Sequence, residues 1–136
     1  MPKIEVSNGE IFDKLSILEV KHKNIKGQDK LAYVAKEYGY LKNVVKTITS
    51  EIDFPLECHT TYIELRDINF RLWDIEDEIR SKEVSIDFGD RFIELSRLIY
   101  TLNDQRFKLK NKINDITNSS FKEQKGHKTC EEERSL

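Results

Sequence analysis

Apolar residues recur at alternating steps of three and four along the chain, which is the spacing that places them on one face of a helix. Four stretches follow this pattern, over about residues 8–26, 29–48, 57–82 and 88–118. The strict alternation of a β-strand does not extend through any of them. The pattern therefore predicts an all-α protein with about four long helices.

Local signals support these helix limits. Ser7 and Glu10 have the spacing of a capping box, in which each side chain bonds the backbone amide of the other residue. Gly27 is typical of the end of a first helix. Pro55 disfavours helix for the residue before it, so a break is expected there. Asp87 is placed to cap the fourth helix.

Short connections make successive helices antiparallel, so we expect an up-down antiparallel helical bundle over residues 1–118. Residues 119–136 are polar, and we expect them to form a disordered tail. The third and fourth predicted helices are longer than the first two, which leaves their far ends uncovered. Either a second copy of the chain covers these ends, or the ends separate to form a cleft. We favour the homodimer.

Composition and charge narrow the classes of function. Charged residues make up 35% of the chain and the formal net charge is -2, which argues against a dedicated nucleic-acid binder. No apolar run approaches the roughly 20 residues of a membrane helix, and the first residues lack the apolar core of a signal peptide. The two cysteines do not form a C-x-x-C pair, so neither a zinc site nor a redox motif is indicated. We expect a cytoplasmic protein without membrane contact, whose protein or small-molecule partner the sequence does not identify.

Polar residues interrupt the apolar faces and give the best signal for a site. Arg106 takes a position where leucine or isoleucine is expected, and Asn103 lies on the same side of that helix. A buried guanidinium is costly unless a carboxylate pairs with it. Glu76 is the first choice for that carboxylate and Asp13 is the second.

These polar positions have two interpretations. They are either salt bridges between helices, which fix how the helices pair, or the lining of a polar cleft between the first, third and fourth helices. The second interpretation predicts a binding or interaction module, with no catalytic residue and no cofactor assigned. Its candidate ligand-binding residues are Glu10, Asp13, Lys14, Trp73, Glu76, Asp77, Arg80, Arg97, Tyr100, Asn103, Asp104 and Arg106.

An alternative function is a metal-dependent hydrolase of a nucleotide or another phosphorylated substrate. Four carboxylates, Glu10, Asp13, Glu76 and Asp77, would then hold Mg²⁺, an ion that prefers oxygen ligands. All-helical nucleotide pyrophosphohydrolases use such sites, but with denser acidic motifs than this chain has. A charged, solvated helix face explains the same residues.

Three segments carry distinctive combinations of residues: S-x-G-E-I-x-D-K-L-x-I-L-E from Ser7, W-D-I-E-D-x-I-R from Trp73 and Y-x-x-N-D-x-R from Tyr100. These segments resemble an uncharacterised family of short helical bacterial proteins, known only as a domain of unknown function. The resemblance extends to about residue 127. It implies a helical fold but supplies no activity and no ligand. Its motifs coincide with the polar positions above, which favours a site there.

Overall fold

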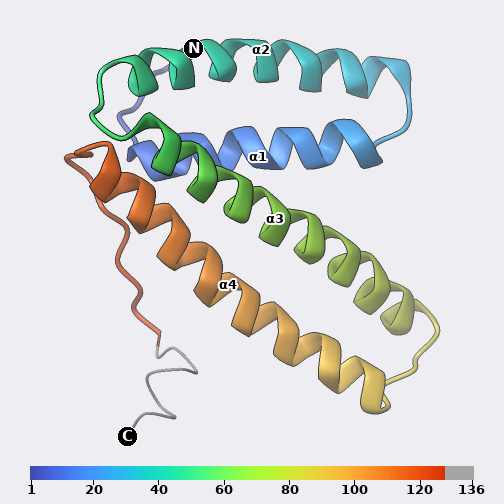
Figure 1. Cartoon of the computed structure of the whole chain (residues 1–136). Coiled ribbons are helices and arrows are strands. Elements are labelled where there is room, and N and C mark those ends of the chain that lie inside the picture. Colours follow the sequence, from blue (N-terminus) through green and yellow to red (C-terminus); the bar gives the residue numbers. More distant parts are fainter. Residues whose placement is uncertain (128–136) are drawn as a thin grey trace, which may run out of the picture.

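A computed structural model describes residues 1–127 and contains four α-helices in that range (Figure 1). They are α1 (Asn8–Asn24), α2 (Gln28–Ser50), α3 (Pro55–Val84) and α4 (Asp90–Ile116). Residues 1–127 contain no β-strand, and successive helices run antiparallel. The predicted all-α, up-down antiparallel bundle is therefore confirmed. None of these four helices is long and apolar enough to cross a membrane.

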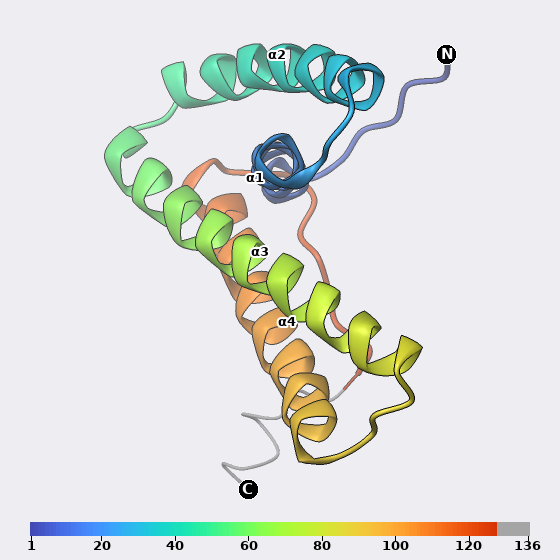
Figure 2. The ribbon, with the colours of Figure 1, turned by 90° about the vertical axis from the view of Figure 1, so that its right-hand side faces the viewer.

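The helices form two antiparallel pairs that meet through α1. α1 packs against α2, α3 and α4, whereas α2 contacts mainly α1 and touches α3 at few positions. Figure 2 looks along α1 and shows α2 on one side of it and the α3–α4 pair on the other. α3 and α4 continue together well past α1, so their far ends are uncovered, as the predicted helix lengths indicated.

The core consists of two apolar clusters, and both use the predicted face of α3. One cluster joins α1, α2, α3 and the end of α4, and the other lies between α3 and α4. Leu65, Leu72 and Ile75 are buried on the predicted face. The apolar face predicted for the first helix runs through Ile11, Leu15, Leu18, His22 and Ile25. Phe12 and Val20 lie outside that face and are equally buried. The reason is that α1 has neighbours on two sides and buries more of its circumference than one apolar stripe.

The start of α1 is fixed by its cap and by close contact with α4. The Oγ of Ser7 accepts a hydrogen bond from the Glu10 amide at 3.2 Å, which confirms one half of the predicted capping box. The other half is wrong, because the Glu10 carboxylate pairs with Lys110 of α4. The amide of Gly9 donates to the Oδ1 of Asn114 at 2.6 Å. A Cβ atom on Gly9 would lie only 2.3 Å from the carbonyl oxygen of Lys110, so no larger residue fits there unless the backbones separate.

The predicted cap of the fourth helix is wrong. α4 begins at Asp90, and the Asp87 carboxylate instead accepts the Gly89 amide at 3.2 Å within the preceding turn. Asp87 follows the end of α3, and its own amide donates to the carbonyl oxygen of Lys82 in the last turn of that helix at 2.9 Å. Ile86, between them, has a φ of 55°, a left-handed conformation that is strained for a β-branched residue.

Residues 118–127, which we call the strap, leave the end of α4 and run back along that helix (Figure 1). Asn111 and Glu123 exchange two hydrogen bonds, of 3.0 and 3.2 Å, which attach the strap to α4. The rest of the expected disordered tail, residues 128–136, lies outside the described residues.

Candidate functional site

The centre of the candidate site is a buried ion pair between α1 and α4. The side chain of Asp13 is only 4% exposed. The guanidinium of Arg106 donates from Nε to Oδ1 of Asp13 at 2.9 Å and from Nη2 to Oδ2 at 2.6 Å. These hydrogen bonds hold the pKa of Arg106 above its ordinary value, although burial alone would lower it. The pairing is bidentate, the geometry in which arginine binds a carboxylate most strongly.

α3 completes the same network through Asn69. Its side-chain amide donates to Oδ1 of Asp13 at 2.9 Å and to the Oγ of Ser16 at 2.7 Å. Ser16 in turn donates to the carbonyl oxygen of Asp13 at 2.7 Å. Three helices therefore meet at one carboxylate, and the surrounding groups fix its orientation.

The first choice of partner for Arg106 is wrong and the second choice is confirmed. Glu76 lies against Arg80, one turn further along α3, at 3.3 Å. Its side chain is 43% exposed, so water stabilises its charge. Asp13 is almost completely buried, and it needs a cation more than Glu76 does.

A second buried cation, Lys110, lies on α4 one turn beyond Arg106. Its Nζ is 2.5 Å from Oε1 of Glu10 and 2.7 Å from Oε2 of Glu123 in the strap. Burial lowers the pKa of Lys110, but the hydrogen bonds with both carboxylates outweigh burial and the net shift is upward. Lys125, also in the strap, pairs with Asp104 on α4 at 3.0 Å.

Two adjoining hollows open beside this network, and we call them together the Arg106 cleft. The first, of about 490 Å³, lies between α1, α3 and α4, and the second, of about 510 Å³, lies between α4 and the strap. Asn103 and Arg106 line both hollows. The other predicted residues in their walls are Trp73, Glu76, Asp77 and Arg80 in the first and Tyr100 and Asp104 in the second.

Ten of the twelve predicted site residues are thus in the cleft or bonded to its cations, and two are elsewhere. Lys14 pairs with Glu37 of α2 at 2.9 Å. Arg97 is exposed in a separate hollow that residues of α4 alone line. Both were placed in the site by their spacing along one helix, which does not show toward which neighbour a side chain points.

The alternative metal site is not formed. Within residues 1–127, no three histidine, cysteine or acidic side chains gather closely enough to hold a metal ion. Three of the four proposed carboxylates pair with separate cations instead: Asp13 with Arg106, Glu10 with Lys110 and Glu76 with Arg80.

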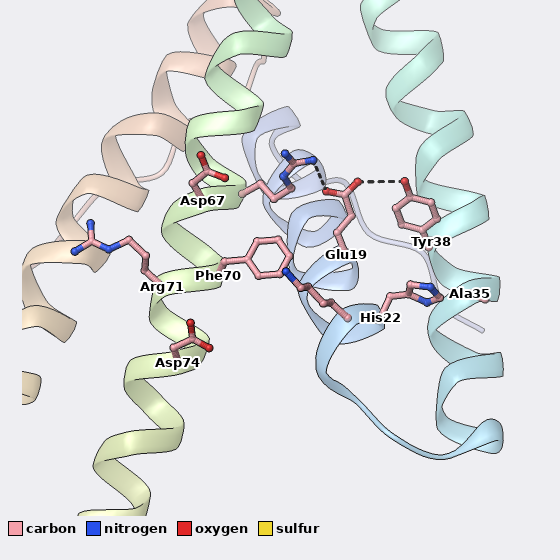
Figure 3. A pocket seen from close by; sticks show the side chains of 10 residues that line it. Glu19, His22, Ala35, Tyr38, Asp67, Phe70, Arg71 and Asp74 are labelled. Atoms are coloured by element: carbon pink, nitrogen blue, oxygen red, sulfur yellow. Dashed lines mark hydrogen bonds and ion pairs between the residues drawn. The ribbon is translucent and has the colours of Figure 1, made fainter.

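Sequence reasoning missed a larger groove on the opposite flank of α1. Two hollows of about 940 and 370 Å³ share Glu19, Tyr38 and Arg66, and together they form a groove with walls from α2 and α3 and a floor from α1. Figure 3 shows the larger hollow, with Glu19 at its centre. His22, expected on the apolar face of the first helix, is exposed in its wall.

The polar centre of this groove is Glu19. The Tyr38 hydroxyl donates to Oε1 of Glu19 at 3.2 Å, and Arg66 approaches Oε2 at 3.4 Å (Figure 3). Burial and the charge of Glu19 raise the pKa of Tyr38. One signal was available in the sequence: Glu19 and His22 follow Leu15 at steps of four and three on one flank of the helix.

Comparison with known proteins identifies the family without adding a ligand. Neither the curated proteins nor the solved structures that were searched gave a match. One family model covers residues 2–135, which include every helix described above. The chain therefore belongs to a family of unknown function, DUF6165.

Proposed function

We propose that the chain is a binding module whose ligand occupies the Arg106 cleft. One observation carries the proposal. Arg106 bonds Asp13 through Nε and Nη2, and its Nη1 makes no hydrogen bond to any described residue. A buried carboxylate thus fixes the guanidinium while one of its edges stays available in the wall of the cleft. Donors held in advance by a supporting shell are typical of binding sites.

The walls of the first hollow suggest the class of ligand. Trp73 offers a large aromatic surface with a single N–H donor. Arg80 supplies a second guanidinium, and its side chain is 78% exposed, so helix packing does not require it. Glu76 and Asp77 supply acceptors in the same wall. Both signs of charge beside an aromatic ring suit a small zwitterion, such as a free amino acid or a dipeptide.

A metal-dependent hydrolase gains no support, because three of the four carboxylates it needs pair with separate cations and no metal-holding group of side chains gathers within residues 1–127. Cys58 is a buried free thiol, which suits a reducing compartment such as the cytoplasm.

The chain's single tryptophan makes the proposal testable. Free amino acids and dipeptides should change the fluorescence of Trp73 in a saturable way and raise the melting temperature with concentration. Their N-acetylated amides, which lack both charges, should do neither. Arg80→Gln should weaken binding at least tenfold, whereas Arg97→Gln, on the outer face of α4, should not. Equal binding of the blocked compounds, or no binding by any of the panel, would overturn the proposal.

A further inference from the structure

The groove between α2 and α3 combines a surplus of positive charge with exposed apolar surface. Five lysine and arginine side chains line it against three carboxylates, together with two histidines. The ammonium of Lys23 lies 5.2 Å from the centre of the Phe70 ring, and that of Lys42 lies 5.8 Å from the centre of the Tyr38 ring. Cations therefore cover an aromatic face on each wall. The groove is suited to an occupant that combines apolar side chains with negative charge.

A buried hydroxyl in the groove is also poorly satisfied. Tyr62 is 8% exposed and lines the smaller hollow, and its hydroxyl lies near the Glu19 carboxylate without a hydrogen bond of regular geometry within the described part of the chain. Burial, together with the nearby charge of Glu19, raises the pKa of this hydroxyl, so it stays protonated as a donor. A buried donor without a well-placed acceptor is costly, and an occupant with carboxylates would offer one.

A segment with the required chemistry exists in the chain itself. Residues 83–94, which we call the tip, join α3 to α4 at the uncovered end and carry four acidic residues against one basic residue. The tip also exposes four large apolar side chains to solvent, with exposed fractions between 51% and 86%: Val84, Ile86, Phe88 and Ile93. Phe88 packs edge-on against Phe92, and all four side chains remain more than half exposed in the same copy.

We propose that the tip of each copy lies in the groove of a second copy, in a reciprocal two-fold dimer. The charges of tip and groove are opposite, and each presents apolar surface that its own copy leaves uncovered. Pairing of tip with tip is disfavoured, because it would bring two acidic segments together. Exchange in both directions closes the assembly at two copies, whereas exchange in one direction would continue into a polymer. The proposal does not depend on the Arg106 cleft.

Charge exchange tests this arrangement directly. Sedimentation velocity from 1 to 500 µM protein should show a monomer–dimer equilibrium that weakens in high salt. Lys42→Glu in the groove and Glu83→Lys in the tip should each weaken the dimer at least tenfold, because both contacts then bring like charges together. A mixture of the two variants should dimerise again. In the mixed pair, one contact is native and the other has both charges exchanged.

A second set of variants tests the apolar part of the contact. Phe88→Ser should weaken the dimer, whereas Tyr33→Ser should not, because Tyr33 is 79% exposed and lies outside the groove and the tip. Circular dichroism should show unchanged helix content in every variant, since all the replaced side chains are exposed. Monomers at every concentration would overturn the proposal. A dimer insensitive to both charge reversals, or a mass that grows beyond two copies, would also overturn it.

Discussion

Replacing Arg106 by leucine should destabilise the fold, although leucine suits an apolar helix face better than arginine does. The reason is the partner left behind. The Asp13 side chain is only 4% exposed in the wild-type protein. Without Arg106 it would keep only one side-chain donor, the amide of Asn69 at 2.9 Å. A buried carboxylate without its cation loses both its Coulombic partner and two hydrogen bonds.

The magnitude follows from the burial of the two partners. Removing one partner of a buried pair costs about 3–5 kcal/mol. Arg106 is 28% exposed, so the lower end of that range, about 3 kcal/mol, applies. Apolar contacts of the new leucine return about 1 kcal/mol. We therefore expect a net loss of about 2 kcal/mol in the free energy of unfolding.

The double variant Asp13→Leu/Arg106→Leu should recover most of this loss, because no buried charge remains. Urea denaturation followed by circular dichroism at 222 nm measures each free energy of unfolding, and an unchanged slope shows that the unfolded states are comparable. Arg97→Leu makes the same exchange at an exposed position of the same helix and should stay within about 0.5 kcal/mol of wild type. The described pairing does not support the fold if Arg106→Leu costs no more than the Arg97→Leu control. The same conclusion follows if the separate losses of Asp13→Leu and Arg106→Leu simply add in the double variant.

Three smaller predictions use other features of the fold. Gly9→Ala should lower the free energy of unfolding by about 1–3 kcal/mol, because the new Cβ would lie 2.3 Å from the α4 backbone. Gly39→Ala has open space around it and should instead raise the free energy of unfolding by about 0.5–1 kcal/mol. Thermal melts of both variants measure these changes. Ile86→Gly should raise the free energy of unfolding by up to about 1 kcal/mol, since it relieves a φ of 55° at a side chain that is 76% exposed, and a lower value in urea titration would contradict this. Burial raises the pKa of the Cys58 thiol to about 11. In the Cys130→Ser variant, iodoacetamide at pH 8 should therefore label Cys58 only as fast as the chain opens, and urea should accelerate the labelling.

Periodicity predicted the helices well because helix formation and one-sided burial are local properties. On α3, residues at steps of three and four are buried as expected, because one face of that helix meets the core. The same reasoning failed for Phe12 and Val20, since α1 lies between two layers and buries two flanks. A single stripe of apolar residues cannot show that a helix is central. That information depends on where the other helices cross it.

The pairing of Arg106 was harder to predict for a related reason. The sequence correctly indicated that a guanidinium on an apolar face needs a carboxylate. It did not determine which carboxylate, because an offset of one helical turn moves a residue about 5.4 Å along the axis. Asp13 and Asn69 come from two other helices, so their meeting with Arg106 depends on how α1 crosses the α3–α4 pair. The close contact at Gly9 fixes that crossing, and no pattern within α1 predicts it.

The central position of α1 also separates the two proposed sites. Asp13 and Glu19 are six residues apart, so they point about 120° apart around the helix axis. Asp13 faces Arg106 of α4, and Glu19 faces the groove between α2 and α3. The side chains of Phe12 and Ser16 lie on the arc between them and are buried. A zwitterion bound in the Arg106 cleft should therefore leave the dimer dissociation constant unchanged, and Lys42→Glu should leave zwitterion affinity unchanged. Coupling between the two measurements would show that α1 moves as one body when either site is filled.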